Sequence, residues 1–386
     1  MIVKNRGAFV VGRGGTGKSK LITGMNSGCQ AFKGLVEAFK ELKLLTYVVA
    51  LTHTAVANVT NAEIEASTLL RFLHGNVQRK QLMAIIIDEC SQVPLSMQSV
   101  LMELKMMGHI IVQMGDPHGQ FLPIPDQARH HMVEKIDTSD FMHDLCNGLH
   151  ITLKKFRRGD DMKHFDFVGS LYKMKVNDAL FHSLYQYELV ESGDANPLID
   201  GVTLTVSHKR RVAVNDVCNR IVRPFVEGAT RFVDVDIVAA VVGVNHPQSM
   251  WLHRGLIMQA CTQRRDAHLQ NGMRYEILDF TNEDGIVKYK FESSDEFGHR
   301  RLDNYTVPIE PRRVPDKSFW LTEQDVMRKM RMTFAVTYFS AQAATIRQPL
   351  RLEDTRHKFF TIRHLIVGLG RAPLGCRVQL CGREVE

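Results

Sequence analysis

Gly12-Arg13-Gly14-Gly15-Thr16-Gly17-Lys18-Ser19 is a complete G-x-x-x-x-G-K-[ST] phosphate-binding loop. Residues 8–11 before it form a short apolar run that suits a buried strand, and residues 20–25 after it can begin a helix. Glycines let backbone N–H groups turn toward a phosphate, and the helix N-terminus adds favourable partial charge. We therefore expect a nucleoside triphosphate here, with the Lys18 ammonium on its outer phosphates and the Ser19 hydroxyl on Mg²⁺. The residues expected to bind the nucleotide are Gly12, Gly14, Gly15, Thr16, Gly17, Lys18 and Ser19.

The composition is that of a soluble globular protein with room for two domains. The chain has 386 residues, of which 44% are hydrophobic and 24% charged. No apolar stretch approaches the roughly 20 residues that span a bilayer, and the N-terminus has no signal-peptide pattern. The 7 cysteines include no C-x-x-C pair, which favours reduced thiols and an intracellular location. The net charge of +7 lies mostly beyond residue 150 and fits a polyanionic partner.

Alternating apolar and helix-compatible stretches predict an α/β protein with parallel sheets. In the first domain, expected over residues 1–150, the apolar runs are 8–11, 47–51, 83–87 and 109–114. In the second domain, expected over residues 151–386, they are 201–206, 333–337 and 364–368. A stretch of different texture, about residues 251–320, has β-like runs at 275–280, 285–291 and 304–309. We interpret this stretch as a small β-rich module inserted into the second domain.

Two acids, Asp88 and Glu89, follow the apolar run that ends at Ile87, which is the Walker B arrangement. Asp88 is expected to hold Mg²⁺ through its water shell, and Glu89 to polarise the attacking water as general base. An acid pair at the end of a strand can also be an ordinary surface feature. The phosphate-binding loop upstream favours the catalytic interpretation.

Residues 88–92 together with residues 112–124 resemble motifs II and III of the superfamily I helicases. The resemblance is to the branch that holds the Pif-type DNA helicases and the replication helicases of large DNA viruses. It continues in order along the chain: residues 50–58 are similar to motif Ia, 156–160 to motif IV, 206–215 to the segment that opens the second core domain, 337–346 to motif V and 367–372 to motif VI.

The resemblance implies two RecA-like parallel-sheet P-loop NTPase domains, with a small β-barrel-like insertion in the second. It implies an ATP-dependent DNA helicase or translocase that moves 5′→3′ along single-stranded DNA and unwinds duplexes in replication or repair. The location stays open, and a nucleus and a viral replication site are both compatible with an intracellular, soluble protein. ATP and Mg²⁺ are the implied cofactors, and single-stranded, forked or duplex DNA are the implied partners. The implied catalytic residues are Lys18, Asp88, Glu89, Gln120, Arg157 and Arg371, with Ser19 and Asp88 on the metal.

Two of those residues have specific roles in the resemblance. Gln120 senses the γ-phosphate, and Arg371 acts as an arginine finger. Motif IV implies an arginine that reaches the γ-phosphate from the second domain; Arg157 is our choice, and Arg158 is nearly equivalent.

Contacts to DNA are implied at both domains. Backbone contacts are expected at Thr52, Thr54, Ser207, Lys209 and Thr345, and base stacking at His53, Phe121 and His208. Two of these residues have a structural alternative. Phe121 can pack in the core beneath Pro123, and His208 can be a strand-end histidine held by hydrogen bonds.

Three departures from the family pattern qualify this expectation. The phosphate loop starts at residue 12, so the upstream segment that reads adenine has no room; the chain is then a fragment, an incomplete reading frame or a member with relaxed base preference. Ala343 replaces a glycine in motif V, and Gly370 replaces a serine in motif VI. The alternative interpretation is a decayed superfamily I NTPase that binds single strands without unwinding, and a P-loop switch ATPase without nucleic acid is a third. The sequence leaves open the choice between DNA and RNA, and the oligomeric state.

Overall fold

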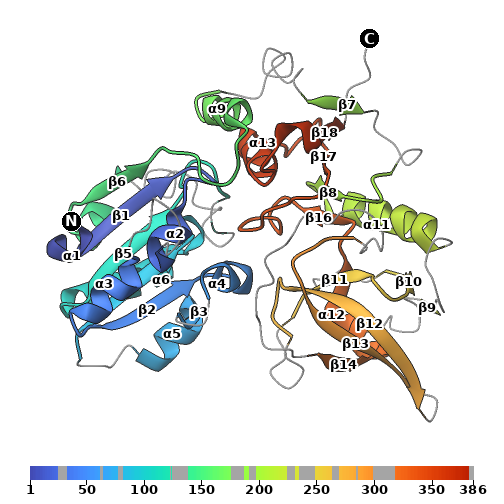
Figure 1. The fold of residues 1–386 in the computed structure, drawn as a ribbon, viewed down its shortest axis with the longest axis horizontal. Helices are drawn as coiled ribbons and strands as arrows, with labels where there is room; N and C mark the ends of the chain where they lie inside the picture. The colour runs from blue at the N-terminus through green and yellow to red at the C-terminus, as the bar shows by residue number, and fades with distance from the viewer. Residues whose placement is uncertain are drawn as a thin grey trace. The chain divides into compact units, whose positions relative to one another are not determined.

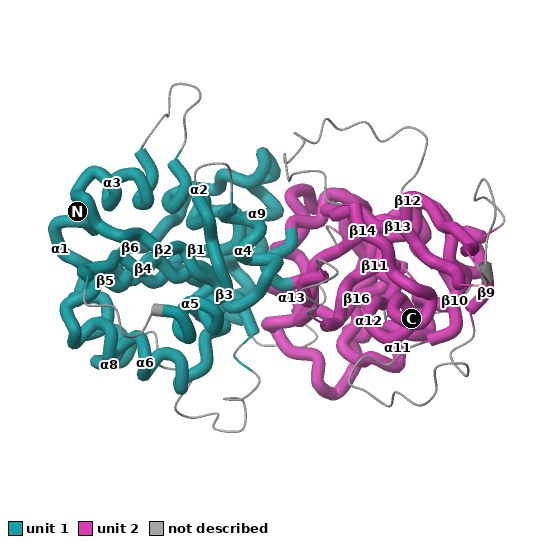
Figure 2. Tube along the Cα trace, turned by 90° about the horizontal axis from the view of Figure 1, so that it is seen from below, with its two compact units in different colours: residues 1–175, 342–344 teal, residues 176–341, 345–386 magenta. Residues whose placement is uncertain are grey.

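The chain is described by a computed structural model in two compact units. The structure describes residues 1–24, 33–60, 64–76, 81–121, 123, 138–174, 187–190, 197–223, 231–233, 248–262, 269–283, 286–298 and 318–381. Unit 1 comprises Met1–Lys175 with Gln342–Ala344, and unit 2 comprises Val176–Ala341 with Thr345–Glu386 (Figure 2). Within the described residues, no helix is both long and apolar enough to cross a bilayer.

Unit 1 is built on a six-stranded parallel sheet in the order β3-β2-β4-β5-β1-β6 (Figure 1). Its strands are β1 (Gly7–Gly12), β2 (Leu45–Ala50), β3 (Ala66–Thr68), β4 (Met83–Asp88), β5 (Ile110–Gly115) and β6 (His150–Leu153). The four apolar runs predicted for the first domain are confirmed as β1, β2, β4 and β5. The two strands that the sequence did not predict, β3 and β6, are the short edge strands, whose polar residues weaken the hydrophobic signal.

Helices cover both faces of this sheet, as expected for continuously apolar parallel strands. On one face α2, α3 and α4 pack against residues such as Ile86, and on the other α5, α6 and α8 pack against Ile85 and Ile87. The helices of the unit are α1 (Ile2–Asn5), α2 (Lys18–Thr23), α3 (Leu35–Glu41), α4 (His53–Val59), α5 (Leu69–Asn76), η1 (Cys90–Gln92), α6 (Leu95–Met106), α8 (Asp140–Leu145) and α9 (Met162–Leu171). Because successive strand residues point to opposite faces, each strand contributes to two cores.

Unit 2 contains a five-stranded parallel sheet in the order β16-β8-β17-β18-β7. The strands are β7 (Glu188–Val190), β8 (Val202–Thr205), β16 (Ala335–Thr337), β17 (Leu350–Leu352) and β18 (Val378–Cys381). Helix α11 (His208–Val222) packs on β8 and β16. The buried Asn215 amide fastens it there, because it accepts from the Ala335 N–H at 2.8 Å and donates to the Ala335 carbonyl at 3.0 Å. The runs predicted at 201–206 and 333–337 are confirmed as β8 and β16.

The third run predicted for this domain is not a strand. Residues 364–368 lie within helix α13 (Ile362–Leu369), so the prediction of a strand there is wrong. A short apolar run cannot distinguish a buried strand from a buried helical turn, and here Leu365, Ile366 and Val367 are all buried in the helix. Gly368 allows the close packing of α13 on β17, because a Cβ there would lie 2.7 Å from Leu352 Cδ2.

The β-rich module is a five-stranded antiparallel sheet in the order β14-β13-β12-β11-β15. Its strands are β11 (Ile257–Ala260), β12 (Arg274–Glu283), β13 (Ile286–Ser294), β14 (Phe319–Thr322) and β15 (Met330–Met332), and helix α12 (Glu323–Lys329) lies between the last two. Outside this sheet, β9 (Arg231–Val233) and β10 (Met250–Leu252) form a separate two-stranded sheet. The short helix η7 (Gly375–Arg377) follows α13. The runs predicted at 275–280 and 285–291 are confirmed as the β12–β13 hairpin. The run at 304–309 lies outside the described residues, and the module extends past residue 320 to Met332.

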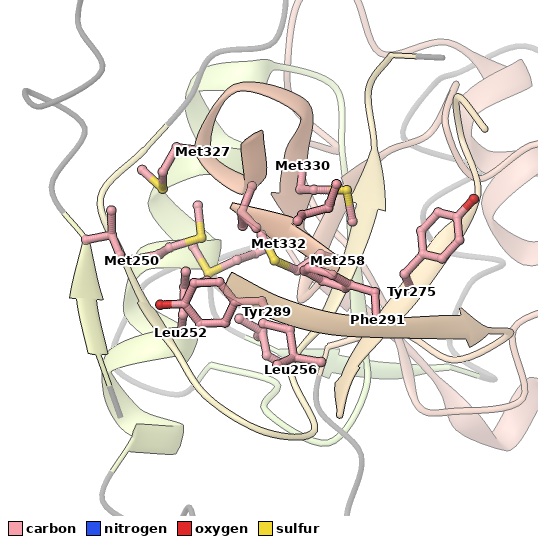
Figure 3. Close-up of a cluster of buried hydrophobic side chains, with 14 of the residues drawn as sticks. Met250, Leu252, Leu256, Met258, Tyr275, Tyr289, Phe291, Met327, Met330 and Met332 are labelled. Atoms are coloured by element: carbon pink, nitrogen blue, oxygen red, sulfur yellow. The ribbon is translucent and has the colours of Figure 1, made fainter. Parts of the chain in front are cut away.

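Methionines fill much of the core of this module. Met258, Met330 and Met332 lie among Tyr289, Phe291 and other buried side chains (Figure 3). A flexible thioether side chain adapts to the irregular gap between a twisted sheet and a short helix. This core is continuous with the packing of α11 and β16, because Val214, Cys218 and Ala335 belong to the same cluster of buried side chains.

Candidate nucleotide and nucleic-acid sites

The phosphate-binding loop connects β1 to α2 in unit 1, where two of its glycines have left-handed backbone. Gly15 has φ +85° and Gly17 has φ +89°, a region in which a Cβ is strained. Space adds a second constraint at Gly15, because a Cβ there would lie 2.8 Å from Cε2 of Phe156. The Thr16 hydroxyl closes the loop by donating to the Arg13 carbonyl at 2.8 Å. The loop thus has the backbone that its glycines predicted.

Lys18 begins α2 and turns its side chain back over the loop. Its Nζ donates to the Gly12 carbonyl at 2.6 Å and to the Arg13 carbonyl at 3.3 Å. The side chain is buried, so the ammonium is held in place by backbone dipoles. This arrangement places a fixed positive charge inside the loop, where a bound phosphate would need it.

Ser19 and Asp88 come together from the start of α2 and the end of β4. The Ser19 hydroxyl donates to Asp88 Oδ2 at 3.0 Å. Asp88 is 2% exposed, and its burial and the nearby Glu89 charge raise its carboxyl pKa to about 7. A hydroxyl and one carboxylate are the oxygen donors that a partly hydrated Mg²⁺ takes, and a cation there would offset the cost of burying the Asp88 charge. The donor set fits Mg²⁺.

Glu89 follows with a strained backbone. Its φ of 55° and ψ of 40° are left-handed, which is uncommon for a residue with a side chain. Its carboxylate accepts a hydrogen bond from Gln120 Nε2. Strained backbone persists where the surrounding structure requires it, and such residues cluster at functional sites. The pairing of Glu89 with Gln120 joins the residues predicted as general base and γ-phosphate sensor.

Asp116 and Tyr172 hold the segment that carries Gln120, and the sequence predictions included neither residue among the site residues. Asp116 is buried; its Oδ1 accepts from the Gly119 N–H at 3.0 Å, and its Oδ2 accepts from the Tyr172 hydroxyl at 2.5 Å. A Cβ on Gly119 would lie 2.1 Å from that hydroxyl. Asp116 could have been predicted from its place at the end of β5. Tyr172 follows α9, far along the chain, and no local pattern indicates its role.

Arg157 lies in unit 1, where its backbone N–H donates to the Gly15 carbonyl at 2.8 Å. We expected it to come from the second domain, and that expectation is wrong. The reason is topological, because β6 pairs with β1 and the chain leaving β6 therefore runs directly over the loop at the end of β1.

An aromatic and cationic stack supports that segment. Phe156 stacks on Phe165 with ring centroids 4.4 Å apart. The Arg13 guanidinium carbon lies 3.7 Å from the centroid of the Phe165 ring, and Arg13 Nη1 donates to the Phe165 carbonyl at 2.9 Å. Cation–π and stacking contacts of this kind hold the loop against α9.

The DNA-contact residues predicted in unit 1 lie at the start of α4 and after β5. Thr52 is the N-cap of α4, with its side chain accepting from the Ala55 N–H at 3.2 Å, and His53 and Thr54 form the first turn. Phe121 is partly buried, and its N–H donates to Gln342 Oε1 at 3.0 Å. Both of its interpretations, stacking and packing, remain predictions.

In unit 2 the predicted DNA contacts lie at two places. Ser207 caps α11 by accepting from the Arg210 N–H at 3.1 Å; His208 follows half-buried and Lys209 exposed. Thr345 is exposed, after β16.

Arg371 is 4% exposed at the end of α13, and its Nε donates to the Val367 carbonyl at 3.2 Å. Its role as an arginine finger stays a prediction.

Two of the three departures from the family pattern, Ala343 and Gly370, have different structural consequences. Ala343 is left-handed, with φ +64°, so alanine occupies a position where glycine has no steric cost. Its methyl group packs against Ala50 and Ala55, and its carbonyl accepts from Asn58 Nδ2 at 2.8 Å. Gly370 has φ −67° and ψ −8°, an ordinary helical conformation, so its backbone uses none of a glycine's additional freedom.

Comparison with known proteins agrees with this architecture. Residues 2–137 match the AAA domain family, and no curated protein matches the chain. The chain is similar to the crystal structure of Pif1 helicase from Candida albicans, with 15% identity, a TM-score of 0.61 and coverage of 99% of this chain and 92% of that one. It is also similar to Bacteroides Pif1 bound to single-stranded DNA, with 13% identity, a TM-score of 0.60 and coverage of 98% and 89%.

A further similar structure is Bacteroides Pif1 in complex with ADP-AlF3 and single-stranded DNA, with 13% identity, a TM-score of 0.57 and coverage of 97% and 88%. These likenesses extend over almost the whole chain and include both parallel sheets. The fold that the motif resemblance implied is confirmed: the chain has the α/β fold of the Pif1 helicases, with RecA-like parallel sheets, and its residues 2–137 match the AAA domain family.

Proposed function

We propose that this protein is an ATP-dependent DNA helicase that moves 5′→3′ along single-stranded DNA and unwinds forked or duplex DNA. The observation that carries the proposal is the convergence of Lys18, Ser19, Asp88, Glu89 and Gln120 at the ends of β1, β4 and β5. Phosphoryl transfer depends mainly on positioning and charge neutralisation, and these groups supply both.

Each group has a definite task in hydrolysis. The loop N–H groups and the Lys18 ammonium bind the β- and γ-phosphates, while Ser19 and Asp88 hold Mg²⁺, which would neutralise developing charge when bound. Glu89 accepts a proton from the attacking water, and Gln120 orients Glu89 and the γ-phosphate. Arg157 stands beside the loop as a second cation, and Arg371 is the proposed finger.

The nucleic-acid contacts proposed for this cycle are Thr52, His53, Thr54, Phe121, Ser207, His208, Lys209 and Thr345. Support comes from their positions at the N-terminal ends of α4 and α11 and after β5 and β16. Helix N-termini carry a positive partial charge that suits phosphate oxygens. The solved Bacteroides relatives were crystallised with single-stranded DNA, which supports the same partner here.

The test is ATP hydrolysis measured with and without single-stranded DNA. We expect strong stimulation by DNA, and we expect Lys18→Ala to abolish hydrolysis while leaving most of the DNA affinity. Unwinding of duplexes with a 5′ or a 3′ tail tests direction, with preference for the 5′ tail expected. Hydrolysis that is indifferent to DNA, or that persists in Lys18→Ala, contradicts the proposal.

The second candidate is a single-strand-binding protein with a decayed ATPase. The left-handed alanine at residue 343 favours it, because a β-carbon stands where the family motif has a glycine, beside the expected contact with the DNA backbone. Tight DNA binding without ATP turnover is the result that would establish this candidate over the first.

A further inference from the structure

The loop of residues 354–360, between β17 and α13, presents one of two adjacent phenylalanines to solvent. Phe359 is 64% exposed, whereas Phe360 is 8% exposed. Phe360 stacks on His364 with centroids 5.4 Å apart and contacts Tyr338 edge-to-face at 5.9 Å. The buried ring anchors the loop, whereas, among the described residues, the exposed Phe359 ring has a ring contact only within the loop, with His357 at 5.5 Å between centroids.

Backbone hydrogen bonds fix the backbone of the loop that carries the exposed ring. The His357 N–H donates to the Asp354 carbonyl at 2.8 Å, and the Phe360 N–H donates to the His357 carbonyl at 2.7 Å. The Thr355 hydroxyl ties the loop to the Cys381 carbonyl of β18 at 2.9 Å. The loop backbone is thus ordered before any ligand binds, so binding at Phe359 would not cost the entropy of ordering the loop.

The charges around Phe359 are positive on the solvent side. Arg356 and Lys358 are exposed, and within the described part of the chain neither makes an ion pair. Lys358 Nζ lies 5.0 Å from the centroid of the Phe359 ring. The acid of the loop, Asp354, turns inward, where its Oδ2 accepts from the N–H groups of Val206 and Ser207 at 2.9 and 3.2 Å.

That inward contact also fixes the position of the loop. It fastens residue 354 at the N-terminal end of α11, next to Ser207 and the exposed Lys209. The 354–360 loop therefore extends a surface that the proposed function already assigns to nucleic acid. None of the motif segments that carry the resemblance includes the 354–360 loop.

We propose that the 354–360 loop is a contact for single-stranded nucleic acid, in which Phe359 stacks on an unpaired base and Arg356 and Lys358 neutralise flanking phosphates. Aromatic rings accept any base face, and cations follow the backbone, so this chemistry recognises a single strand without reading its sequence. In a duplex the bases stay paired and stacked on one another, so no base face is available to stack on the Phe359 ring. The proposal rests on the proposed function and specifies one further part of its DNA surface.

The experiment measures binding of the full chain to a fluorescent oligothymidine and to a blunt duplex by anisotropy. Phe359→Ala should weaken oligothymidine binding about 5–150-fold, the range for removal of one stacked base, and Phe359→Trp should restore it. Trp320→Ala is the matched control, because Trp320 is an aromatic residue 43% exposed on β14 of the β-rich module. It should bind both nucleic acids as the wild type does.

A double variant, Arg356→Gln with Lys358→Gln, tests the neutralisation of phosphates. The slope of log affinity against log salt should become shallower by roughly 0.7 for each phosphate that the variant no longer neutralises. Arg220→Gln, at the far end of α11, is the control for removal of an exposed cation and should leave the slope unchanged.

Several outcomes overturn the proposal. Wild-type oligothymidine affinity in Phe359→Ala refutes it, as does an equal loss of oligothymidine and duplex binding, since only unpaired bases can stack on the ring. Circular dichroism confirms that each variant is folded. If the wild type itself binds no single strand, both this proposal and the helicase function fail. If the wild type binds single strands and the loop variants bind them equally well, only this proposal fails and the helicase function stands.

Discussion

Tyr172→Phe is the substitution that most directly tests how the Gln120 segment is held. The change deletes one hydroxyl that donates to Asp116 Oδ2 at 2.5 Å and keeps the ring. Asp116 is buried, so water cannot fully replace the missing donor. The remaining hydrogen bond of that carboxylate comes from the Gly119 N–H, one residue before Gln120.

The magnitude follows from the kind of bond. A hydrogen bond to a charged group contributes about 1.5–3 kcal/mol, so the free energy of unfolding should fall by that amount. If the same energy positions Gln120 against Glu89 in the transition state, kcat for ATP hydrolysis should fall about 10–150-fold. The phosphate-binding loop is untouched, so we expect the affinity for ATP to stay within a factor of about two of the wild type.

The assays are urea unfolding for stability, steady-state ATP hydrolysis for kcat, and binding of a fluorescent ATP analogue. Tyr289→Phe is a matched control, because it removes a tyrosine hydroxyl that donates to Glu323 at 3.2 Å in the β-rich module. It should lower stability and leave kcat unchanged. Wild-type kcat in Tyr172→Phe, or an equal fall of kcat in both variants, would refute the reasoning.

Substitutions at three further positions test the fold. Asn215→Ala should lower the free energy of unfolding by about 2–4 kcal/mol in a denaturant titration, because it leaves the buried N–H and carbonyl of Ala335 without their partner; a decrease below about 1 kcal/mol contradicts this. Burial lowers the pKa of His364 to about 4, from an ordinary value of 6.5, so the stability that its neutral form contributes is complete above pH 6.5 and is lost as pH falls toward 4. His364→Gln keeps an acceptor for the Thr361 cap and should flatten that pH dependence of unfolding; an unchanged slope argues against the assignment. Ala343→Val should cost about 2 kcal/mol or more at φ +64°, while Ala343→Gly should change stability by less than about 1 kcal/mol, and equal effects in denaturant unfolding would show that the left-handed backbone is not the cause.

Sequence patterns predicted the parts of the fold whose signal is local. The strands β1, β2, β4 and β5 are continuously apolar because helices cover both of their faces, so their burial is visible in the residues themselves. The prediction of a strand at residues 364–368 was wrong because a short apolar run indicates burial without indicating the type of element. An apolar run of five residues carries no information on which partner buries it, and in α13 it is packed on β17.

The candidate nucleotide site was predictable for a related reason. A phosphate-binding loop requires glycines where its backbone has positive φ, followed by a lysine that contacts the phosphate. Gly15, Gly17 and Lys18 are therefore recognisable from their order along the chain. The assignment of Arg157 to the second domain failed because it depended on where β6 pairs, and strand order is a property of the sheet.

What the sequence determined by itself was the chemistry: a loop that turns N–H groups toward a phosphate, two acids after a strand, and a second α/β domain with a β-rich module. Only the tertiary structure decided how distant residues support one another. It joined Tyr172 to Asp116, turned Arg371 inward to the Val367 carbonyl, and exposed Phe359 while burying Phe360. Local patterns record which residues a site requires. The pairing of residues far apart in the chain follows from strand order and packing, which no short segment contains.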